Sequence, residues 1–278
     1  MANILALFIV LASLFLPLSA RAAEAVDFSA LLPPEQVQIA QVIDPLRLRL
    51  QDGKIIQLTG IEIPDLDPYE PGERAVAALA RLKPLLEGKQ ARLYLTKDSR
   101  KGRINRMGYT LGHVQTGGDN PEWLQGLLIA EGYARARPDI VNPEMAAAMT
   151  ALENSARENN VGLWADPVYA VRNPDNAGEL TGRFGVVEGT IHAVAMNNNT
   201  VFLNFGPDWK TDFTIGLDSE VRRAFVKQNI DPLQLGGKTI RVRGWVENYN
   251  GPFIRLDDLS KLEFIQEPQN DLQNDPGL

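Results

Sequence analysis

The sequence predicts a mostly β (α+β) protein built from two OB-type five-stranded barrels, the first of which carries three helices. Short segments in which apolar and polar residues alternate predict half-buried strands. Asp52-Gly53 and Asn250-Gly251 predict hairpin turns between such strands. A segment rich in proline and glycine, residues 166–183, divides the chain into two blocks. The length of 278 residues is sufficient for two domains of ordinary size.

The first block contains both strand and helix periodicities. Alternation predicts strands at residues 37–43, 46–50, 55–61, 91–95 and 109–114. Apolar residues at helical spacing predict helices at residues 73–87, 122–133 and 142–160. We expect Asn142 to cap the third helix, because Pro143 follows it at the first helical position. These elements are compatible with a small OB-type barrel.

The second block is richer in strands. Alternation predicts strands at residues 186–194, 201–205, 212–216, 239–246 and 253–256, with a serine-capped helix at 219–229. The aromatic residues near the second and third strands are Phe202, Phe205, Trp209 and Phe213. They form either the barrel core or a face on which nucleobases stack, as in many OB barrels. Trp209 lies in a turn, so it is the aromatic residue that we expect to be exposed.

The N-terminus has the layout of a secretory signal peptide. An apolar run from Ile4 to Leu18 is shorter than the roughly 20 residues that cross a bilayer as a helix, and Ala20 and Ala22 follow at the small-residue positions of a cleavage site. The segment before the run lacks the usual Lys or Arg, so an uncleaved anchor is the alternative. We expect an exported protein, periplasmic or secreted, with no membrane span after removal of the signal.

The domain organisation follows from these elements. We predict a signal peptide at residues 1–22, a lead-in segment at 23–36, a first barrel domain at 37–171, a linker at 172–183, a second OB-like domain at 184–265 and a disordered tail at 266–278.

The composition excludes some chemistry. The chain has no cysteine, which excludes disulfides, thiol nucleophiles and thiolate zinc sites. The formal net charge of −7 argues against a broad basic field for nucleic acid, so polyanion binding must depend on a local patch. Residues 97–106 are strongly basic, and Lys101, Arg103 and Arg106 are the phosphate-binding candidates in this loop. The alternative is a solvated loop. His113 and His192 have no metal-ligand spacing, so we expect structural roles for both.

Several segments of the first block are similar to one known family. They are Val42-Ile43-Asp44, the stretch from Gln57 to Asp65, the stretch from Asn105 to Tyr109, and Gly162-Leu163-Trp164. Together they resemble the staphylococcal-nuclease-like (thermonuclease) family over about half of the chain. The resemblance implies calcium-dependent phosphodiester hydrolysis, in which carboxylates hold the metal, a glutamate assists water and two arginines bind the phosphate. A weaker similarity links residues 205–209 and 242–245 to the C-terminal OB-like accessory domain of some exported nuclease-like proteins.

Most of the positions that the resemblance assigns to catalysis are substituted here. Gln57 and Tyr109 stand where the two arginines belong, and Asp65 replaces the glutamate. Leu46 stands at the first metal-ligand position, which leaves Glu62 and Asp65 as weak metal candidates. A rival alignment of the second arginine with Lys101-Gly102-Arg103 would return a cation to the site.

The sequence therefore predicts a nuclease-like protein that is catalytically impaired or inactive. We expect it to bind nucleic acid or another polyanion, or a protein of the cell envelope, without a cofactor. One alternative is an active calcium-dependent endonuclease with a rearranged site built from Arg103, Arg106 and the acidic loop of Glu62, Asp65 and Asp67. The other alternative is a pure protein-interaction scaffold.

Overall fold

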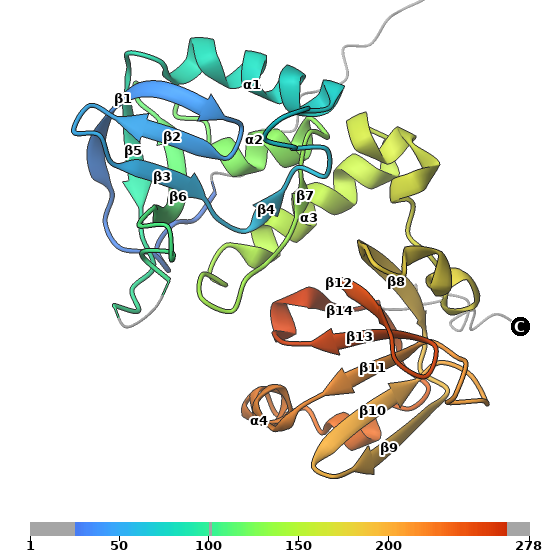
Figure 1. The fold of residues 1–278 in the computed structure, drawn as a ribbon. Coiled ribbons are helices and arrows are strands. Elements are labelled where there is room, and N and C mark those ends of the chain that lie inside the picture. The colour runs from blue at the N-terminus through green and yellow to red at the C-terminus, as the bar shows by residue number, and fades with distance from the viewer. Residues whose placement is uncertain (1–25, 100–101, 266–278) are drawn as a thin grey trace, which may run out of the picture.

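The computed structural model describes residues 26–99 and 102–265, which form two domains (Figure 1). We call residues 26–165 the barrel domain and residues 174–265 the C-terminal domain. The signal peptide expected at residues 1–22, the tail expected at 266–278 and Lys101 lie outside the described residues.

The barrel domain contains a closed barrel of five strands, as predicted. The strands are β1 (Glu35–Asp44), β2 (Arg47–Leu50), β3 (Ile55–Leu58), β5 (Gln90–Tyr94) and β6 (Thr110–Thr116). They pair in the order β1-β2-β3-β6-β5; β3 and β6 run parallel, and the other neighbouring strands of the barrel run antiparallel. Alternate side chains such as Leu48 and Ile56 point into the barrel and are fully buried.

Three helices surround the barrel, which also agrees with the prediction. They are α1 (Glu73–Leu86), α2 (Leu124–Ala130) and α3 (Ala146–Glu158). Leu82 and Leu86 of α1 are buried in the core, and Pro84 lies within the last turn of this helix. The predicted start of the third helix is wrong, because α3 begins at Ala146. Asn142 does not cap α3: its buried side chain donates to the carbonyl of Gly102 at 2.9 Å and so holds the basic loop.

The strand predicted at residues 55–61 is divided in two. It breaks at Gly60, whose φ of 80° favours glycine. A Cβ atom at this position would also lie 2.4 Å from the side chain of Met149. After the break, β4 (Ile61–Glu62) leaves the barrel and pairs with β7 (Arg135–Ala136). Gly60 therefore separates the barrel wall from the ribbon that carries Glu62.

The C-terminal domain has more strands than predicted. They are β8 (Phe184–Thr190), β9 (Ala193–Asn197), β10 (Thr200–Asn204), β11 (Thr214–Leu217), β12 (Thr239–Asn248), β13 (Pro252–Leu256) and β14 (Leu262–Phe264). The first predicted strand is split into β8 and β9, with His192 in the break rather than on a strand, and β14 is added at the edge of β12. The single helix α4 (Ser219–Lys227) is capped by Asp218, not by Ser219.

The two domains share one connectivity. In the C-terminal domain β9, β10, β11, β13, β12 and β8 pair in succession, and β11 and β13 run parallel as β3 and β6 do. Because β8 and β9 are consecutive, this path begins and ends on the same stretch of chain. Both α1 and α4 connect the third barrel strand to the fourth. The pairing order of the C-terminal domain is therefore that of an OB-type barrel.

Short 3-10 helices complete the described chain. They span Gly162–Ala165, Pro167–Tyr169, Pro174–Leu180, Pro232–Gln234 and Leu259–Lys261. Ala177 and Leu180, which fall in the segment expected to be a linker, are buried in the core of the C-terminal domain. Phe213 is also buried there and packs against Phe205, whereas Trp209 is 57% exposed, as expected.

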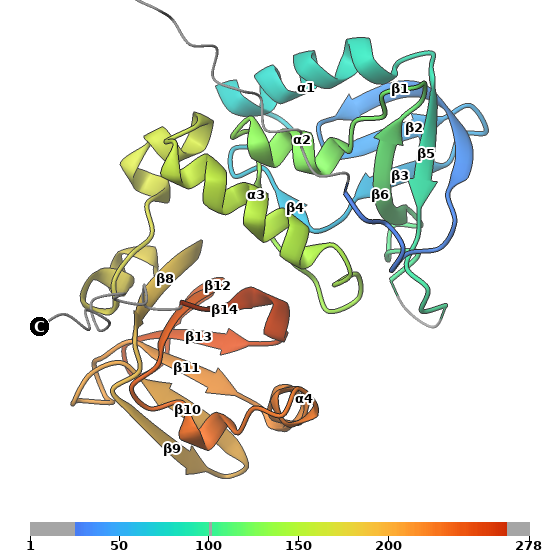
Figure 2. The ribbon, with the colours of Figure 1, turned by 180° about the vertical axis from the view of Figure 1, so that it is seen from behind.

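A buried ion pair joins the two domains. Helix α3 lies on the side of the barrel domain that faces β8 and β12 (Figures 1 and 2). Arg243 of β12 is fully buried there and donates to the Glu153 carboxylate of α3 at 2.7 Å and to the Glu263 carboxylate of β14 at 2.6 Å. The other oxygen of Glu153 accepts from the backbone N–H of Ala136 at 2.6 Å. Glu153 thus holds β7 within its own domain and binds the neighbouring domain.

The protonation states in this interface follow from burial and pairing. Burial alone would lower the pKa of the Arg243 guanidinium, but attraction to Glu153 and Glu263 outweighs it and raises that pKa above its ordinary value. Burial would raise the pKa of Glu263, but Arg243 and a hydrogen bond from Asn154 lower it. Arg243 and Glu263 are therefore charged at neutral pH, and each stabilises the charge of the other.

Replacement of Arg243 should destabilise the protein strongly. Arg243→Met removes the cation that is hydrogen-bonded to the buried Glu153 carboxylate and leaves the more distant Arg157, at 3.8 Å; breaking such a pair costs about 3–5 kcal/mol. The double variant Arg243→Met/Glu153→Gln should recover part of this loss, because it removes the fully buried carboxylate as well; the recovery is partial because Arg157, 3.8 Å from Glu153, loses its partner. Urea unfolding followed by tryptophan fluorescence measures both. The control is Arg241→Met, which breaks a less buried pair with Glu188 and should cost less. Equal unfolding midpoints for Arg243→Met and the wild type would contradict the role of this ion pair.

His113 is a buried core residue on β6. It is 1% exposed and its ring centroid lies 5.7 Å from that of Trp123. Neither ring nitrogen has a hydrogen-bond partner within the described chain. Burial disfavours the charged imidazolium and lowers the pKa of His113 from 6.5 to about 3. The folded protein therefore holds this residue in its neutral form.

This burial predicts a loss of stability in acid. The unfolded chain binds a proton at His113 below pH 6.5, whereas the folded chain does so only below about pH 3. Stability should therefore fall by about 1.4 kcal/mol per pH unit between these values. The variant His113→Leu should lack this dependence of stability on pH. The control variant His192→Ala, at an exposed position, should keep it. Unfolding free energies from pH 7 to pH 4 test the difference; parallel curves for wild type and His113→Leu would refute it.

Candidate functional site

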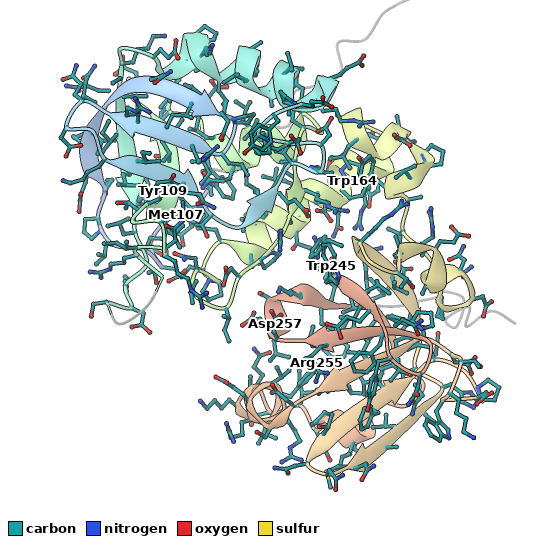
Figure 3. The ribbon with its side chains drawn as sticks, in the orientation of Figure 1. Met107, Tyr109, Trp164, Trp245, Arg255 and Asp257 are labelled. Carbon is teal, nitrogen blue, oxygen red and sulfur yellow. The ribbon has the colours of Figure 1, made fainter. Side chains whose placement is uncertain are left out.

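A cavity of about 580 Å³ opens beside β2 and β3 of the barrel domain. Figure 3 shows two of its lining residues, Met107 and Tyr109, next to β3. Most of the lining is apolar. The apolar lining residues are Ile43, Pro45, Leu46, Leu66, Pro68, Pro71, Ala75, Val76, Leu79 and Met107. The polar ones are Asp44, Arg47, Gln57, Asp67 and Tyr109.

The structure brings three of the predicted site positions together in this cavity. Gln57, Tyr109 and Leu46 all line it. The Asn105 amide donates to Gln57 Oε1 at 2.8 Å, and Asn105 Oδ1 accepts from the backbone N–H groups of Met107 and Tyr109 at 2.9 and 3.0 Å. Asn105 thereby fixes the turn that places Tyr109 near Gln57. This hydrogen bond occupies the amide oxygen of Gln57. The Gln57 side chain is neutral, so it brings no positive charge to a phosphate.

Arg47 is a cavity residue that the sequence analysis did not single out. It is the cross-strand partner of Gln57, and its Nε donates to Asp44 Oδ2 at 2.5 Å. Partial burial works against the charge, but Asp44 and Tyr109 together raise the pKa of the Arg47 guanidinium above its usual value. The cavity therefore contains a cation whose charge is balanced by a carboxylate. The only hint of this ion pair in the sequence was that Asp44 and Arg47, which carry opposite charges, are three residues apart.

Glu62 lies outside this cavity. It is the cross-strand partner of Arg135 in the β4–β7 ribbon. Its carboxylate oxygens lie 3.1 Å from Arg135 Nε and 3.8 Å from Arg137 Nη1. The Arg135 guanidinium also stacks 4.8 Å from the ring centroid of Phe184 in the C-terminal domain. Glu62 thus belongs to the charged contacts near the domain boundary.

Asp65 caps helix α1. Its Oδ2 accepts from the backbone N–H of Arg74 at 3.2 Å, in the first turn of the helix. Gly72 lies so close that a Cβ atom there would be 2.4 Å from Asp65 Oδ2. A carboxylate at a helix N-terminus satisfies free N–H groups and the helix dipole. Asp65 therefore has a structural role, and it does not line the cavity.

The remaining acid of the loop, Asp67, also binds backbone. Its Oδ1 accepts from the N–H groups of Tyr69 and Glu70 at 2.7 and 2.9 Å. These two hydrogen bonds lower the pKa of Asp67, and the one from Glu70 lowers it more. The carboxylate therefore stabilises the turn from Asp67 to Glu70.

The residues present do not fit the calcium ion that the resemblance implies. Calcium requires several oxygen ligands that converge on one point. Leu46 offers none, while Glu62 pairs with two arginines and Asp65 caps a helix. Within residues 26–99 and 102–265, no three acidic or histidine side chains group in a way that could hold a metal.

The described part of the basic loop is directed away from the cavity. Arg103 donates to the backbone carbonyls of Thr96 and Lys97 at 3.0 and 3.2 Å. Lys97 donates to the carbonyl of Ser29 at 2.7 Å. Arg106 is exposed and has no ion pair within the described chain. Neither Arg103 nor Arg106 lines the cavity, so the rival alignment through Arg103 receives no geometric support.

The barrel and its cleft define the class of the first domain, and a sequence comparison supplies the family. A closed five-stranded barrel with a helix between its third and fourth strands is an OB-type barrel. Residues 55–166 match the family described as staphylococcal nuclease homologue, so the chain carries a domain of this nuclease family. The match begins at β3, and β1 and β2, with Leu46 between them, precede it. No curated protein matches the chain.

Proposed function

We propose that this chain is an exported nuclease-family protein that binds nucleic acid and does not cleave it by the calcium-dependent reaction of its family. One observation carries the proposal. Leu46, Gln57 and Tyr109, which replace a metal ligand and two arginines, line a single cavity. At these three positions the cleft therefore has side chains that neither ligate a hard cation nor supply a guanidinium.

The energetic consequence is large. The transition state of phosphodiester hydrolysis gains negative charge, so it needs fixed positive charge nearby. Loss of one preorganised donor typically costs about 2.7–4 kcal/mol, or on the order of 10²–10³ in rate. Two arginines are replaced here, and the one cation in the cavity, Arg47, is paired with Asp44. A neutral ion pair stabilises a developing anion much less than a free guanidinium does.

The alternative of a rearranged nuclease site has less support. It requires Arg103 and Arg106 to act with the carboxylates of the acidic loop. Arg103 is bound to backbone carbonyls, and Glu62 pairs with Arg135 at 3.1 Å. Asp65 and Asp67 are hydrogen-bonded to backbone N–H groups. Within the described chain, Asp65 Oδ1 and Arg106 have no such partner, but these groups do not converge on one position.

A protein partner at the cleft is a second candidate. The observation that favours it is the apolar lining, with Met107 71% exposed at the rim and Tyr69 91% exposed on the neighbouring loop. An apolar interface keeps its affinity as salt rises, whereas phosphate contacts weaken steeply. Salt dependence of binding therefore separates this candidate from nucleic-acid binding.

The wild-type protein should not cut nucleic acid in a calcium-dependent way. The experiment uses fluorescent single-stranded DNA and RNA, with calcium in one arm and a chelator in the other. We expect the two arms to give the same rate, since the cleft lacks a ligand set for calcium. Calcium-dependent cutting that disappears in Arg103→Ala or Arg106→Ala would overturn the proposal and support the rearranged site. Circular dichroism of each variant confirms that it is folded.

We also propose export with removal of residues 1–22. The support is the apolar run followed by small residues at the cleavage site, and no helix among the described residues is long and apolar enough to cross a membrane. When the full-length precursor is expressed in a bacterium with a working secretion system, the product should begin at about Ala23. Intact-mass measurement of the protein from each cell fraction tests this. A product that keeps Met1 and stays with the membrane would indicate an uncleaved anchor instead.

A further inference from the structure

The C-terminal domain exposes aromatic residues on the outer face of its sheet. Val246 and Ile254 are cross-strand partners on β12 and β13, and both point into the core. Side chains alternate along a strand, so the neighbouring residues Trp245, Phe253 and Arg255 point outward. Figure 3 shows Trp245 between the two domains and Arg255 further along the same sheet.

Phe253 is the centre of this face. It is 2% exposed, and the Cζ end of its ring covers Gly216 of β11, where a Cβ atom would lie 2.4 Å away. The ring of Tyr249 meets it edge-on with centroids 5.3 Å apart, and the Arg255 guanidinium lies 5.6 Å from its centroid. We define the aromatic face as Trp245, Tyr249, Phe253 and Arg255.

Two members of the aromatic face present their rings to solvent. Trp245 is 53% exposed and Tyr249 is 54% exposed, even with both domains in place. Arg255 lies on the strand beside Trp245 and is exposed, and it has no ion pair within the described chain. On its other side, Trp245 is the cross-strand partner of Phe184, and the Arg137 guanidinium lies 5.5 Å from the centroid of that ring. One strand beside Trp245 thus carries Arg255, and the aromatic neighbour on the other strand is covered by Arg137, which also lies 3.8 Å from Glu62.

We propose that the aromatic face binds single-stranded nucleic acid. Unpaired bases stack on Trp245 and Tyr249, and the phosphates contact Arg255 and Arg137. Sequence-tolerant binding of single strands combines aromatic platforms with cations that follow the backbone. Tyr249 lies in the loop between the fourth and fifth barrel strands, which is one of the loops that bind oligonucleotides in OB folds. This inference rests on the proposed function, because it names the surface that binds and the form of the nucleic acid.

The charge of the face favours a nucleic acid over a protein. An arginine that has no ion pair within the described chain and lies beside the exposed Trp245 complements a phosphate backbone, whereas the core of a protein interface is depleted in charged residues. The carboxylate of Asp257, which follows β13, is neutralised by Lys261 at 2.7 Å. Glu247 is the exception: it is the cross-strand partner of Phe253, is exposed and has no ion pair within the described chain. The negative charge of Glu247 opposes phosphate binding. Its removal should therefore strengthen binding, whereas removal of Arg255 should weaken it.

The test is fluorescence anisotropy of fluorescein-labelled oligodeoxythymidine with the full chain in a chelating buffer. Trp245→Ala should weaken binding about 5- to 150-fold through loss of base stacking. Arg255→Gln should reduce the slope of log affinity against log salt by about 0.7, the value for one lost phosphate contact on a single strand. Glu247→Gln should strengthen binding, and a duplex of the same length should bind more weakly than the single strand. The matched control is Trp209→Ala, which removes an equally exposed tryptophan that lies in a turn with Asp208 and Asp212.

The outcomes separate this inference from the proposed function. If the wild type binds the oligonucleotide and Trp245→Ala binds it equally well, the aromatic face is refuted while nucleic-acid binding stands. Loss of binding in Trp209→Ala with no loss in Trp245→Ala would place the site elsewhere on the C-terminal domain. If the wild type binds neither single-stranded DNA nor RNA at low salt, both proposals fail and the face is a surface for a protein partner.

Discussion

The arrangement of the two domains depends on one buried ion pair, that of Arg243 with Glu153. Neither charge is exposed to water, so each requires the other. Glu153 also accepts from the backbone of Ala136, which ties the β4–β7 ribbon to the same carboxylate. This ribbon carries Glu62 and Arg135, and Arg135 stacks on Phe184 of the C-terminal domain. The contacts that hold the domains together thus include a residue that the family resemblance assigns to the metal.

The same constraint explains the candidate site. A hydrolytic centre needs charges that are free to bind a metal or a phosphate. Around this cleft each charge has a fixed partner: Arg47 has Asp44, Glu62 has Arg135, and Asp65 has the N-terminus of α1. In this part of the molecule these paired charges stabilise the fold. On the C-terminal domain, by contrast, Arg255 lies beside the exposed Trp245 and has no ion pair among the residues that the structure describes.

Local patterns predicted most strands and helices, and the errors occurred where tertiary contacts decide. The strand at 55–61 breaks because Gly60 faces the side chain of Met149. Asn142 does not cap α3, because its amide binds the carbonyl of Gly102, forty residues earlier. Alternation in the region of β8 and β9 continues through His192, so it did not show that the strand divides there. Motif alignment singled out Leu46, Gln57 and Tyr109, which line the cavity, but it did not single out Arg47, since the role of Arg47 depends on its cross-strand partner Gln57 and on Asp44.

The sequence by itself determined the α+β class and the barrel with its three helices, and its resemblance to the nuclease family pointed to Leu46, Gln57 and Tyr109. These follow from side-chain periodicity and from motifs that are contiguous in the chain. Only the tertiary structure decided which charges are free and which are paired. Arg243 and Glu153 are ninety residues apart in the sequence, and Trp245 and Phe184 are cross-strand partners on the neighbouring strands β12 and β8. Such partners are set by strand register and domain packing, because the free energy of a charge depends on its burial and on what lies within a few ångströms of it.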